Sequence, residues 1–215
     1  LEQVDHIDDL PGYAQGSFFM QDIGSMQVVE LAGIKPGDAV IDVCAAPGGK
    51  AMHALAKLHG KGSVQARDLT ENKVSMIEEN IERCAGAADT IEVLVWDARI
   101  LDPQAVEKAD VVIADLPCSG LGVIGRKSDI KYRMTPEQVA DIAALQREIL
   151  SVVWQYVKPG GILMYSTCTL TKAENQDNRD WFLENSPFTL LEEKELLPSA
   201  ETDGFYMIKC RRNKA

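Results

Sequence analysis

The sequence of 215 residues contains no apolar run long enough to cross a bilayer, and no cationic segment followed by an apolar one at its N-terminus. It is also poor in positive charge: 22 Lys and Arg residues stand against 33 Asp and Glu residues, a net charge of -11. Because phosphate binding depends on Lys and Arg, this balance argues against a domain that holds a polyanion by its overall field. We expect a soluble, cytoplasmic protein without a membrane partner.

The sequence also lacks the cysteine spacing of a disulfide framework or a structural zinc site. Its cysteines are odd in number and none forms a C-x-x-C pair. The five are Cys44, Cys84, Cys118, Cys168 and Cys210. Free thiols fit a reducing compartment, and no metal site is expected.

Strand-like and helix-like patterns alternate along the sequence. From residue 38 onward, short β-branched runs alternate with helical patterns, which is typical of βαβ units and a mostly parallel sheet. The length fits either one large α/β domain or one such domain with a short lead-in segment. The predicted strands are residues 39–43, 63–67, 91–95, 110–114 and 162–165, with further strand-like stretches at 188–191 and 205–209.

Two helix starts are visible in the second half of the sequence. Residues 135–138 supply an N-cap threonine, a first-turn proline and the glutamine partner of a capping box, which predicts a helix that stops before residue 159. Thr171 and Glu174 form a second candidate capping box, which predicts a helix through residues 181–182.

A buried-type strand runs into a turn of small residues at 44–50, and a helical pattern follows. Small residues let a ligand approach the backbone N–H groups of a helix N-terminus. The turn is neither a Walker A loop nor the dinucleotide G-x-G-x-x-G pattern. Asp68 follows about 20 residues later, where an acid binds ribose hydroxyls in nucleotide-binding folds. The two features predict a cofactor with a ribose, although Asp68 alone fits a cap for the helix after Thr70 equally well.

Two cysteine motifs follow the fourth and fifth predicted strands, at residues 115–120 and 165–169. Both cysteines therefore stand at carboxyl ends of parallel strands, where α/β sheets bind ligands. A lone cysteine at such a place is typical core filler. Cys118 and Cys168 beside Asp115 instead indicate a nucleophilic thiol with a neighbouring acid or base. The residues alone predict a cysteine-assisted transferase.

The motifs at 42–50, 115–120 and 166–169, in this order and spacing, resemble those of the RNA cytosine-C5 methyltransferase family. The resemblance extends to residues 21–25 and 202–206, and it is strongest to the bacterial small-subunit ribosomal RNA enzymes. It implies an α/β, Rossmann-like class I methyltransferase fold, with seven strands, the last inserted antiparallel, and helices on both faces.

The resemblance also implies how the chain is organised. Residues 1–30 would be a lead-in segment from a preceding region, and residues 31–215 the methyltransferase domain. Family members carry a helical, antitermination-factor-like RNA-binding domain ahead of the catalytic part. That domain is expected to be missing from this chain, which fits the acidic charge, and a monomer is expected.

Roles for individual residues follow from the same resemblance. The methionine part of S-adenosylmethionine would lie on Cys44, Ala45, Ala46, Pro47, Gly48, Gly49 and Lys50. Asp68 would contact the ribose, and Asp97, after the third strand, the adenine side. Cys168 is implied as the nucleophile and Cys118 as the group that assists product release. Asp115 would contact both the cofactor surroundings and the cytosine ring.

The chemistry explains the need for a cysteine. Carbon 5 of cytosine is too weak a nucleophile to take a methyl group unaided, whereas thiolate addition at carbon 6 moves electron density onto carbon 5. A protonated Asp115 hydrogen-bonded to the ring nitrogen would stabilise the developing charge. The target base must be unpaired or flipped to reach such a pocket.

Residues 126–133 form a local basic segment with Tyr132 in it. Four positive residues minus Asp129 give +3, the positive ones being Arg126, Lys127, Lys131 and Arg133. Because the segment follows the Pro-Cys motif, it is a candidate to bind RNA phosphates at the entrance of the active site. The alternative is a solvated charged face. The sequence departs from the family pattern at Gly125, where many relatives are basic, and at Ala51, where a hydroxyl residue is common.

Small-subunit ribosomal RNA is the expected substrate, and other functions compete with it. One is cytosine-C5 methylation of transfer RNA. Another is methylation of DNA cytosine or of an exocyclic amine, although the Pro-Cys motif lacks the aromatic residue of amino-methyltransferases. A non-catalytic RNA-binding module with a methyltransferase fold is disfavoured because Cys118, Cys168 and the strand-end acids are all present.

Overall fold

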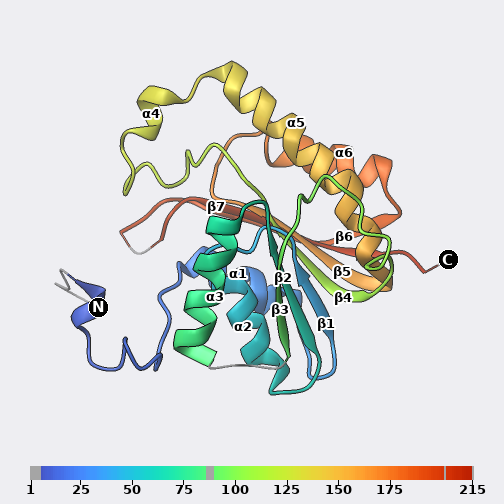
Figure 1. Cartoon of the computed structure of the whole chain (residues 1–215). Coiled ribbons are helices and arrows are strands. Elements are labelled where there is room, and N and C mark those ends of the chain that lie inside the picture. Colours follow the sequence, from blue (N-terminus) through green and yellow to red (C-terminus); the bar gives the residue numbers. More distant parts are fainter. Residues whose placement is uncertain (1–5, 86–89, 201, 215) are drawn as a thin grey trace.

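The computed structural model describes residues 6–85, 90–200 and 202–214. At its centre is a seven-stranded sheet in the order β3-β2-β1-β4-β5-β7-β6 (Figure 1). Parallel pairing joins neighbours from β3 to β5, and β7 pairs antiparallel with both β5 and β6. The strands are β1 (Ala39–Asp42), β2 (Ser63–Asp68), β3 (Ile91–Val95), β4 (Ala109–Asp115), β5 (Val157–Thr167), β6 (Phe188–Leu196) and β7 (Phe205–Arg212). The predicted seven-stranded, mostly parallel sheet is confirmed.

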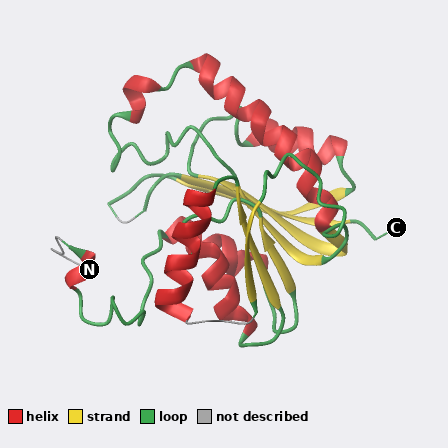
Figure 2. Ribbon diagram, in the orientation of Figure 1, coloured by secondary structure: helices red, strands yellow, loops and turns green. Residues whose placement is uncertain are grey.

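Helices cover both faces of the sheet (Figures 1 and 2). One face carries α1 (Ile23–Ala32), α2 (Gly49–Leu58) and α3 (Glu71–Ala85). The other carries α5 (Pro136–Val153) and α6 (Gln176–Asn185). The shorter helices are η1 (Ile7–Asp9), α4 (Ile130–Arg133) and η2 (Trp154–Tyr156). Across the described ranges, no helix has the length and apolar character needed to span a membrane.

The central strands are buried on both faces. In β4, Val112 and Ala114 belong to the core under α5 and α6, whereas Val111 and Ile113 belong to the core under α1 and α2. Side chains alternate across a strand, so a strand with two buried faces consists of continuous apolar residues. This burial on both faces fixes the register of β4 in the centre of the sheet.

β2 and β3 differ from the central strands because one of their faces is not covered. On the side of α5 and α6 they carry Gln65, Arg67 and Glu92. The connection between β3 and β4, residues 96–108, contains no helix that could cover this face. The polar residues of β2 lie on this face, where Gln65 is partly exposed and Arg67 is buried against the rings of Trp96 and Tyr156.

The predicted capping box at the start of α5 is confirmed. Thr135 Oγ1 accepts from the backbone N–H of Gln138 at 3.3 Å, and the Gln138 side chain accepts from the N–H of Thr135 at 2.9 Å. The helix ends at Val153, before residue 159 as expected.

β5 begins earlier than the sequence predicted. The strand starts at Val157 and includes residues 159–161. Val157 pairs with Ala109 of β4 before the register shifts at a bulge. The proline and the two glycines fall within this irregular stretch, where such residues are tolerated in a strand.

The second predicted capping box is wrong. α6 begins at Gln176, with Asn175 as its N-cap residue. The carboxylate of Glu174 accepts from the Thr171 hydroxyl at 2.7 Å and from the backbone N–H of Ser119 at 2.8 Å. Its side chain points into the protein interior and not back onto the N-terminus of the helix.

The predicted division between residues 30 and 31 falls inside α1. Val28 and Val29 are fully buried in the same core as α2 and the sheet. Lys209 of β7 also donates to the carbonyl of Leu31 at 2.7 Å. We therefore propose that the packed unit extends upstream of residue 31. Residues 1–5 of the predicted lead-in lie outside the described residues.

Candidate active site

Three loops meet at the carboxyl edge of the sheet (Figure 1). β1 leads into the turn at 44–50, β4 ends at Asp115 ahead of Cys118, and β5 ends at Thr167 ahead of Cys168. Because β4 pairs in parallel with both β1 and β5, the three predicted motifs come together at one edge.

The two cysteines predicted to act together are in direct contact. The Sγ atoms of Cys118 and Cys168 lie 3.0 Å apart, and the backbone N–H of Cys168 donates to Cys118 Sγ at 3.3 Å. Both thiols are free and partly buried. One sulfur can therefore hold a proton for the other while solvent is largely kept out.

The surroundings favour the thiolate on Cys168. The hydrogen bond from Cys118 lowers the pKa of the Cys168 thiol, with help from the charge of Lys50 and against the effects of burial and of Asp115. That same hydrogen bond, together with burial, raises the pKa of the Cys118 thiol. Burial also raises the pKa of Cys44. Since the thiolate is the reactive form, the lowered pKa makes Cys168 the more reactive thiol of the pair.

Lys50 connects the turn to the Pro-Cys motif. Its Nζ forms an ion pair with Asp115 and donates to Ser25 Oγ at 3.0 Å. Asp115 Oδ1 in turn accepts from the hydroxyl of Ser166 at 2.7 Å. Burial disfavours the charged form of Lys50, but the neighbouring carboxylates of Asp115 and Asp42 outweigh it, so the pKa of Lys50 is raised. A fixed positive charge therefore stands beside the cysteines.

Asp42 is a site residue that the sequence analysis missed. Its side chain is 1% exposed, and neither carboxylate oxygen has a hydrogen-bond partner among the described residues. Burial raises its pKa to about 7. Asp42, Cys44, Lys50 and Asp115 share a cavity of about 150 Å³. The available signal was an acid at the end of a buried strand, directly ahead of the small-residue turn.

The turn itself has the backbone that its small residues require. Gly48 has a φ of 103° and forms the N-cap of α2, a conformation that favours glycine. A Cβ at Gly49 would lie 2.9 Å from the ring of Phe19, so a larger residue would disturb this contact. The backbone N–H of Ala46 donates to Asp68 Oδ2 at 3.0 Å. Asp68 thus supports the turn, as well as standing at the end of β2.

Asp68 and Asp97, the two aspartates expected at the nucleoside of the cofactor, line the same cavity. This cavity of about 210 Å³ is lined by both aspartates, by Trp96 and by Cys44. Lys73 forms an ion pair with Asp68 at 2.9 Å. The hydrogen bonds from Arg99 lower the pKa of Asp97. Because Cys44 lines both this cavity and the one at Asp42, the two cavities are adjacent.

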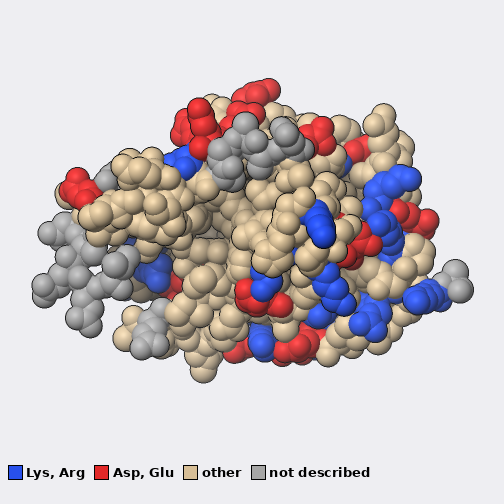
Figure 3. Space-filling view, turned by 90° about the horizontal axis from the view of Figure 1, so that it is seen from below, with Lys and Arg blue, Asp and Glu red and all other residues tan. Residues whose placement is uncertain are grey.

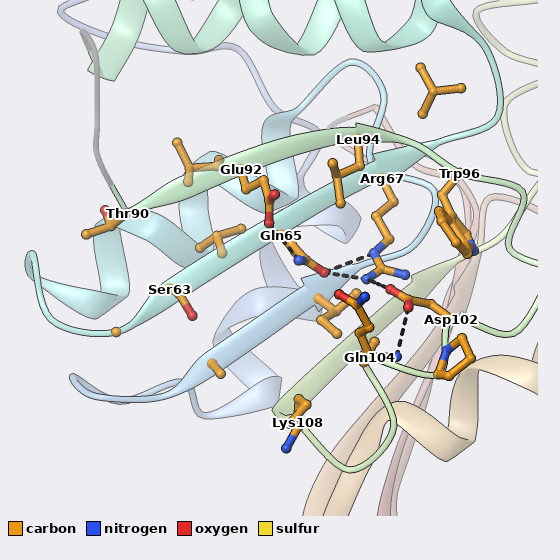
Figure 4. Close-up of a pocket in the computed structure, with 18 residues that line it drawn as sticks. Ser63, Gln65, Arg67, Thr90, Glu92, Leu94, Trp96, Asp102, Gln104 and Lys108 are labelled. Atoms are coloured by element: carbon orange, nitrogen blue, oxygen red, sulfur yellow. Dashed lines mark hydrogen bonds and ion pairs between the residues drawn. The ribbon is translucent and has the colours of Figure 1, made fainter.

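Another cavity lies away from the cysteines, along β2 and β3 (Figure 4). It measures about 1030 Å³, and none of the predicted site residues lines it. Arg67 is fully buried beside it, donates to Gln65, pairs with Asp102 at 2.8 Å, and lies over the rings of Trp96 and Tyr156. We interpret this cavity as the sheet face left open by the helix-free β3–β4 connection.

The basic segment 126–133 includes α4 and is partly engaged in ion pairs. Arg126 pairs with Asp22 at 3.4 Å and with Asp203 at 3.3 Å. Tyr132 is 81% exposed, with the Lys131 ammonium 4.8 Å from its ring centre. Within the described parts of the chain, no group of three or more His, Cys, Asp or Glu side chains is arranged to hold a metal ion.

Comparisons with known proteins agree with this geometry. The chain is similar to the ribosomal RNA small subunit methyltransferase B of Vibrio cholerae, with 37% identity over 96% of this chain and 49% of that protein. The protein of the same description from Serratia proteamaculans is 35% identical over 94% of this chain and 49% of its own length. The chain thus spans about half the length of the curated relatives it matches.

Solved structures share the whole fold. NSun6 from Pyrococcus horikoshii, solved with SFG, superposes with a TM-score of 0.89 at 29% identity, over 99% of this chain and 57% of that one. A methyltransferase homolog from Pyrococcus horikoshii gives a TM-score of 0.83 at 28% identity, over 96% of this chain and 72% of that one. These likenesses confirm the predicted Rossmann-like class I methyltransferase fold.

The family model described as 16S rRNA methyltransferase RsmB/F matches residues 29–209, which include the cysteine pair, the turn and the strand-end acids. Both the extent of this match and the identity to the curated relatives confirm the resemblance found in the motifs. The chain therefore belongs to the RsmB/F family of 16S rRNA methyltransferases.

Proposed function

We propose that this chain catalyses S-adenosylmethionine-dependent methylation of carbon 5 of a cytosine in RNA, with small-subunit ribosomal RNA as the substrate. The observation that carries the proposal is the contact of 3.0 Å between the sulfurs of Cys118 and Cys168. An amino-group methyltransferase has no need for a thiolate with a second thiol beside it. Addition to a pyrimidine ring and its later reversal need both groups.

The residues present fit S-adenosylmethionine. Cys44 lines both adjacent cavities, so an elongated ligand can lie across it with its nucleoside at Asp68 and Asp97. Its amino-acid end would then lie at the cavity of Asp42, whose unpartnered carboxylate suits a cationic group. When bound, the cofactor supplies an electrophilic methyl group on a positively charged sulfur.

The chain's own residues account for the remaining steps. Cys168 Sγ bonds to carbon 6 of the cytosine, which makes carbon 5 nucleophilic enough to accept the methyl group. Once Cys168 Sγ is bonded to carbon 6, its thiolate no longer holds the proton on Cys118 by hydrogen bonding. Cys118 then releases this proton to solvent, and its thiolate removes the carbon-5 proton. Loss of that proton restores the ring, and the bond to Cys168 Sγ breaks.

Asp115 takes a different role from the protonated acid expected from the sequence. Its ion pair with Lys50 and its hydrogen bond from Ser166 leave it as an acceptor, suited to the cytosine amino group. Donation of a proton to the ring nitrogen would require the pair with Lys50 to open. The positive charge of Lys50 instead offsets negative charge that develops near Asp115.

RNA contact falls to the basic segment 126–133 and its exposed Tyr132, whose ring can stack on an unpaired base. Elsewhere the charge is unfavourable for RNA. On the face seen in Figure 3, positive and negative side chains are interspersed without a continuous basic field. Given the net charge of -11, we propose that most RNA affinity comes from a separate upstream RNA-binding domain. The chain itself would act as a cytoplasmic monomer.

The test is the chemical identity of the product. A small-subunit ribosomal RNA transcript is incubated with the full-length protein, which includes the proposed upstream domain, and with methyl-labelled S-adenosylmethionine. It is then digested to nucleosides and analysed by mass spectrometry. The proposal requires 5-methylcytidine. Label in N4-methylcytidine would overturn the carbon-5 chemistry, and equal labelling of transfer RNA would overturn the substrate assignment.

A further inference from the structure

A buried carboxylate joins the loops that carry the two cysteines. Glu174 lies six residues after Cys168 and is fully buried. Its Oε2 accepts from the backbone N–H of Ser119, the residue next to Cys118, at 2.8 Å, and its Oε1 accepts from the Ser119 hydroxyl at 2.5 Å. The two cysteine motifs are therefore tied together through one side chain.

Both carboxylate oxygens of Glu174 accept hydrogen bonds. Besides the two bonds from Ser119, it accepts from Gln146 Nε2 of α5 at 3.1 Å and from the Thr171 hydroxyl at 2.7 Å. A carboxylate can accept at both oxygens from several donors, which suits a buried place where four N–H and O–H groups converge. None of these donors is a group of the cofactor cavities.

The surrounding polar groups hold the same two loops. Gln146 also donates to the carbonyl of Pro117 at 2.9 Å, which lies on the other side of Cys118. Asn175, next to Glu174, donates to the carbonyl of Thr169 at 2.9 Å and accepts from the Thr167 hydroxyl at 2.6 Å. Each cysteine is thus flanked by residues anchored to this buried cluster.

We propose that Glu174 is a positioning residue, which clamps the loop of Cys118 against the loop of Cys168 and so keeps the two sulfurs side by side. It touches neither sulfur, and acts on Cys118 through Ser119. That the clamp serves catalysis rests on the proposed function, whereas its effect on thiol reactivity does not.

The clamp should be visible in the acidity of Cys168. The charged and titratable groups that face this thiol are Cys118, Asp115 of β4 and Lys50 of α2. Asp115 and Lys50 are held by β4, α2 and their own ion pair, independently of Glu174. Loss of the clamp therefore removes chiefly the hydrogen bond from Cys118, and the Cys168 thiolate becomes harder to form.

The experiment measures iodoacetamide alkylation of Cys168 against pH, by peptide mass spectrometry, in the wild type and in Glu174→Ala. We expect the pH midpoint to rise by about one unit in the variant, as for the loss of one hydrogen bond to a charged group. Glu174→Gln should restore most of the wild-type midpoint, because one oxygen can still accept from Ser119 N–H while the hydroxyls reverse direction.

Asp110→Ala is the matched control. Asp110 also ties segments together, by accepting from the N–H of Ala39 at 2.9 Å and from Lys158 at 2.7 Å, but at the opposite edge of the sheet. The Asp110→Ala variant should have a lower melting temperature than the wild type but the same pH midpoint of Cys168 alkylation. Should Glu174→Ala not fold, Ser119→Ala removes only the hydroxyl from the cluster and should give a smaller upward shift.

The proposal is overturned if a folded Glu174→Ala or Ser119→Ala protein titrates at Cys168 like the wild type, or if Asp110→Ala moves the midpoint equally. Cofactor binding by the same proteins separates this result from the proposed function. A wild type that fails to bind S-adenosylmethionine would contradict the function and leave the alkylation result intact.

Discussion

Cys118 and Cys168 lie sulfur to sulfur at 3.0 Å although 50 positions separate them in the sequence. The contact exists because β4 and β5 are parallel neighbours that end in the two cysteine motifs. The pair is asymmetric, because their hydrogen bond lowers the pKa of the Cys168 thiol and raises that of the Cys118 thiol. Their variants should therefore fail in different ways.

Cys168→Ala should lower methyl transfer by at least about 1,000-fold, as expected for loss of a nucleophile, and should form no covalent RNA complex. Cys118→Ala should still attack and methylate, but elimination should stall and leave an RNA adduct. Denaturing electrophoresis with RNA and cofactor distinguishes the two, with Cys84→Ala as the control that behaves like wild type. Adduct accumulation in Cys168→Ala with normal turnover by Cys118→Ala would reverse the two roles.

Oxidation should join the same two sulfurs. A thiolate in contact with a thiol readily forms a disulfide in the presence of an oxidant such as diamide. Diamide accepts the two hydrogens and is itself reduced to a hydrazine. We expect a Cys118–Cys168 linked peptide, loss of two hydrogens from the intact mass, and reversal by dithiothreitol. Cys210 is fully buried and should remain a free thiol throughout. If diamide left the pair reduced in folded protein, the contact would not exist in solution.

Asp42 should make stability depend on pH. Its pKa is about 7 in the folded protein against an ordinary value of 3.8, so the folded state keeps the proton over this interval while the unfolded state loses it. Folding stability from this group therefore falls as pH rises from about 4 to about 7 and is constant above. Asp42→Asn should stabilise the cofactor-free protein at pH 8 by on the order of 3 kcal/mol.

Urea unfolding at pH 5 and pH 8 measures the difference in unfolding free energy between Asp42→Asn and the wild type. This difference should be larger at pH 8. The same substitution should weaken S-adenosylmethionine binding above pH 7, because it removes the negative charge that faces the cofactor cavity. A variant that is no more stable at pH 8 than at pH 5, relative to wild type, would show that Asp42 is not buried in this way.

Arg67 should contribute more to stability than any surface arginine. It is fully buried between the rings of Trp96 and Tyr156 and pairs with Asp102 at 2.8 Å. Arg67→Ala leaves Asp102 without its cation and should cost about 3–5 kcal/mol in urea unfolding. Arg133→Ala, at an exposed pair with Asp129, is the control and should cost less than about 0.5 kcal/mol. Equal losses would contradict the burial of Arg67.

The sequence predicted those parts of the fold that leave a local pattern of apolar or capping residues. β4 and α5 were found because two-sided burial produces an apolar run and a helix start leaves a capping box. The start of β5 at Val157 was not found, since it depends on pairing with Ala109 some 48 positions earlier. Glu174 was misassigned because its partner, Ser119, lies on a loop that no local pattern brings near.

The site was predictable in its parts but not in its connections. The cysteines, the turn and the strand-end acids all follow from motifs at strand ends. The ion pair of Lys50 with Asp115 and the pairing of Arg126 with Asp22 depend on how loops from distant segments meet. Asp42 was only one residue of the predicted strand 39–43. That its side chain has no hydrogen-bond partner in the described part of the chain is visible only once the neighbouring strands are in place.

The antiparallel insertion of β7 has a consequence for how the protein is made. β7 lies between β5 and β6 although it follows both in the chain, and its first residues adjoin the active-site loops, where Gly204 N–H donates to the carbonyl of Gly122 at 2.9 Å. During synthesis on the ribosome, β5 can pair with β4, but its other edge stays unpaired until β7 has left the exit tunnel. Until then the strand that ends beside Cys168 is paired on one edge alone, so a product that stops before residue 205 lacks half of the pairing that supports this loop.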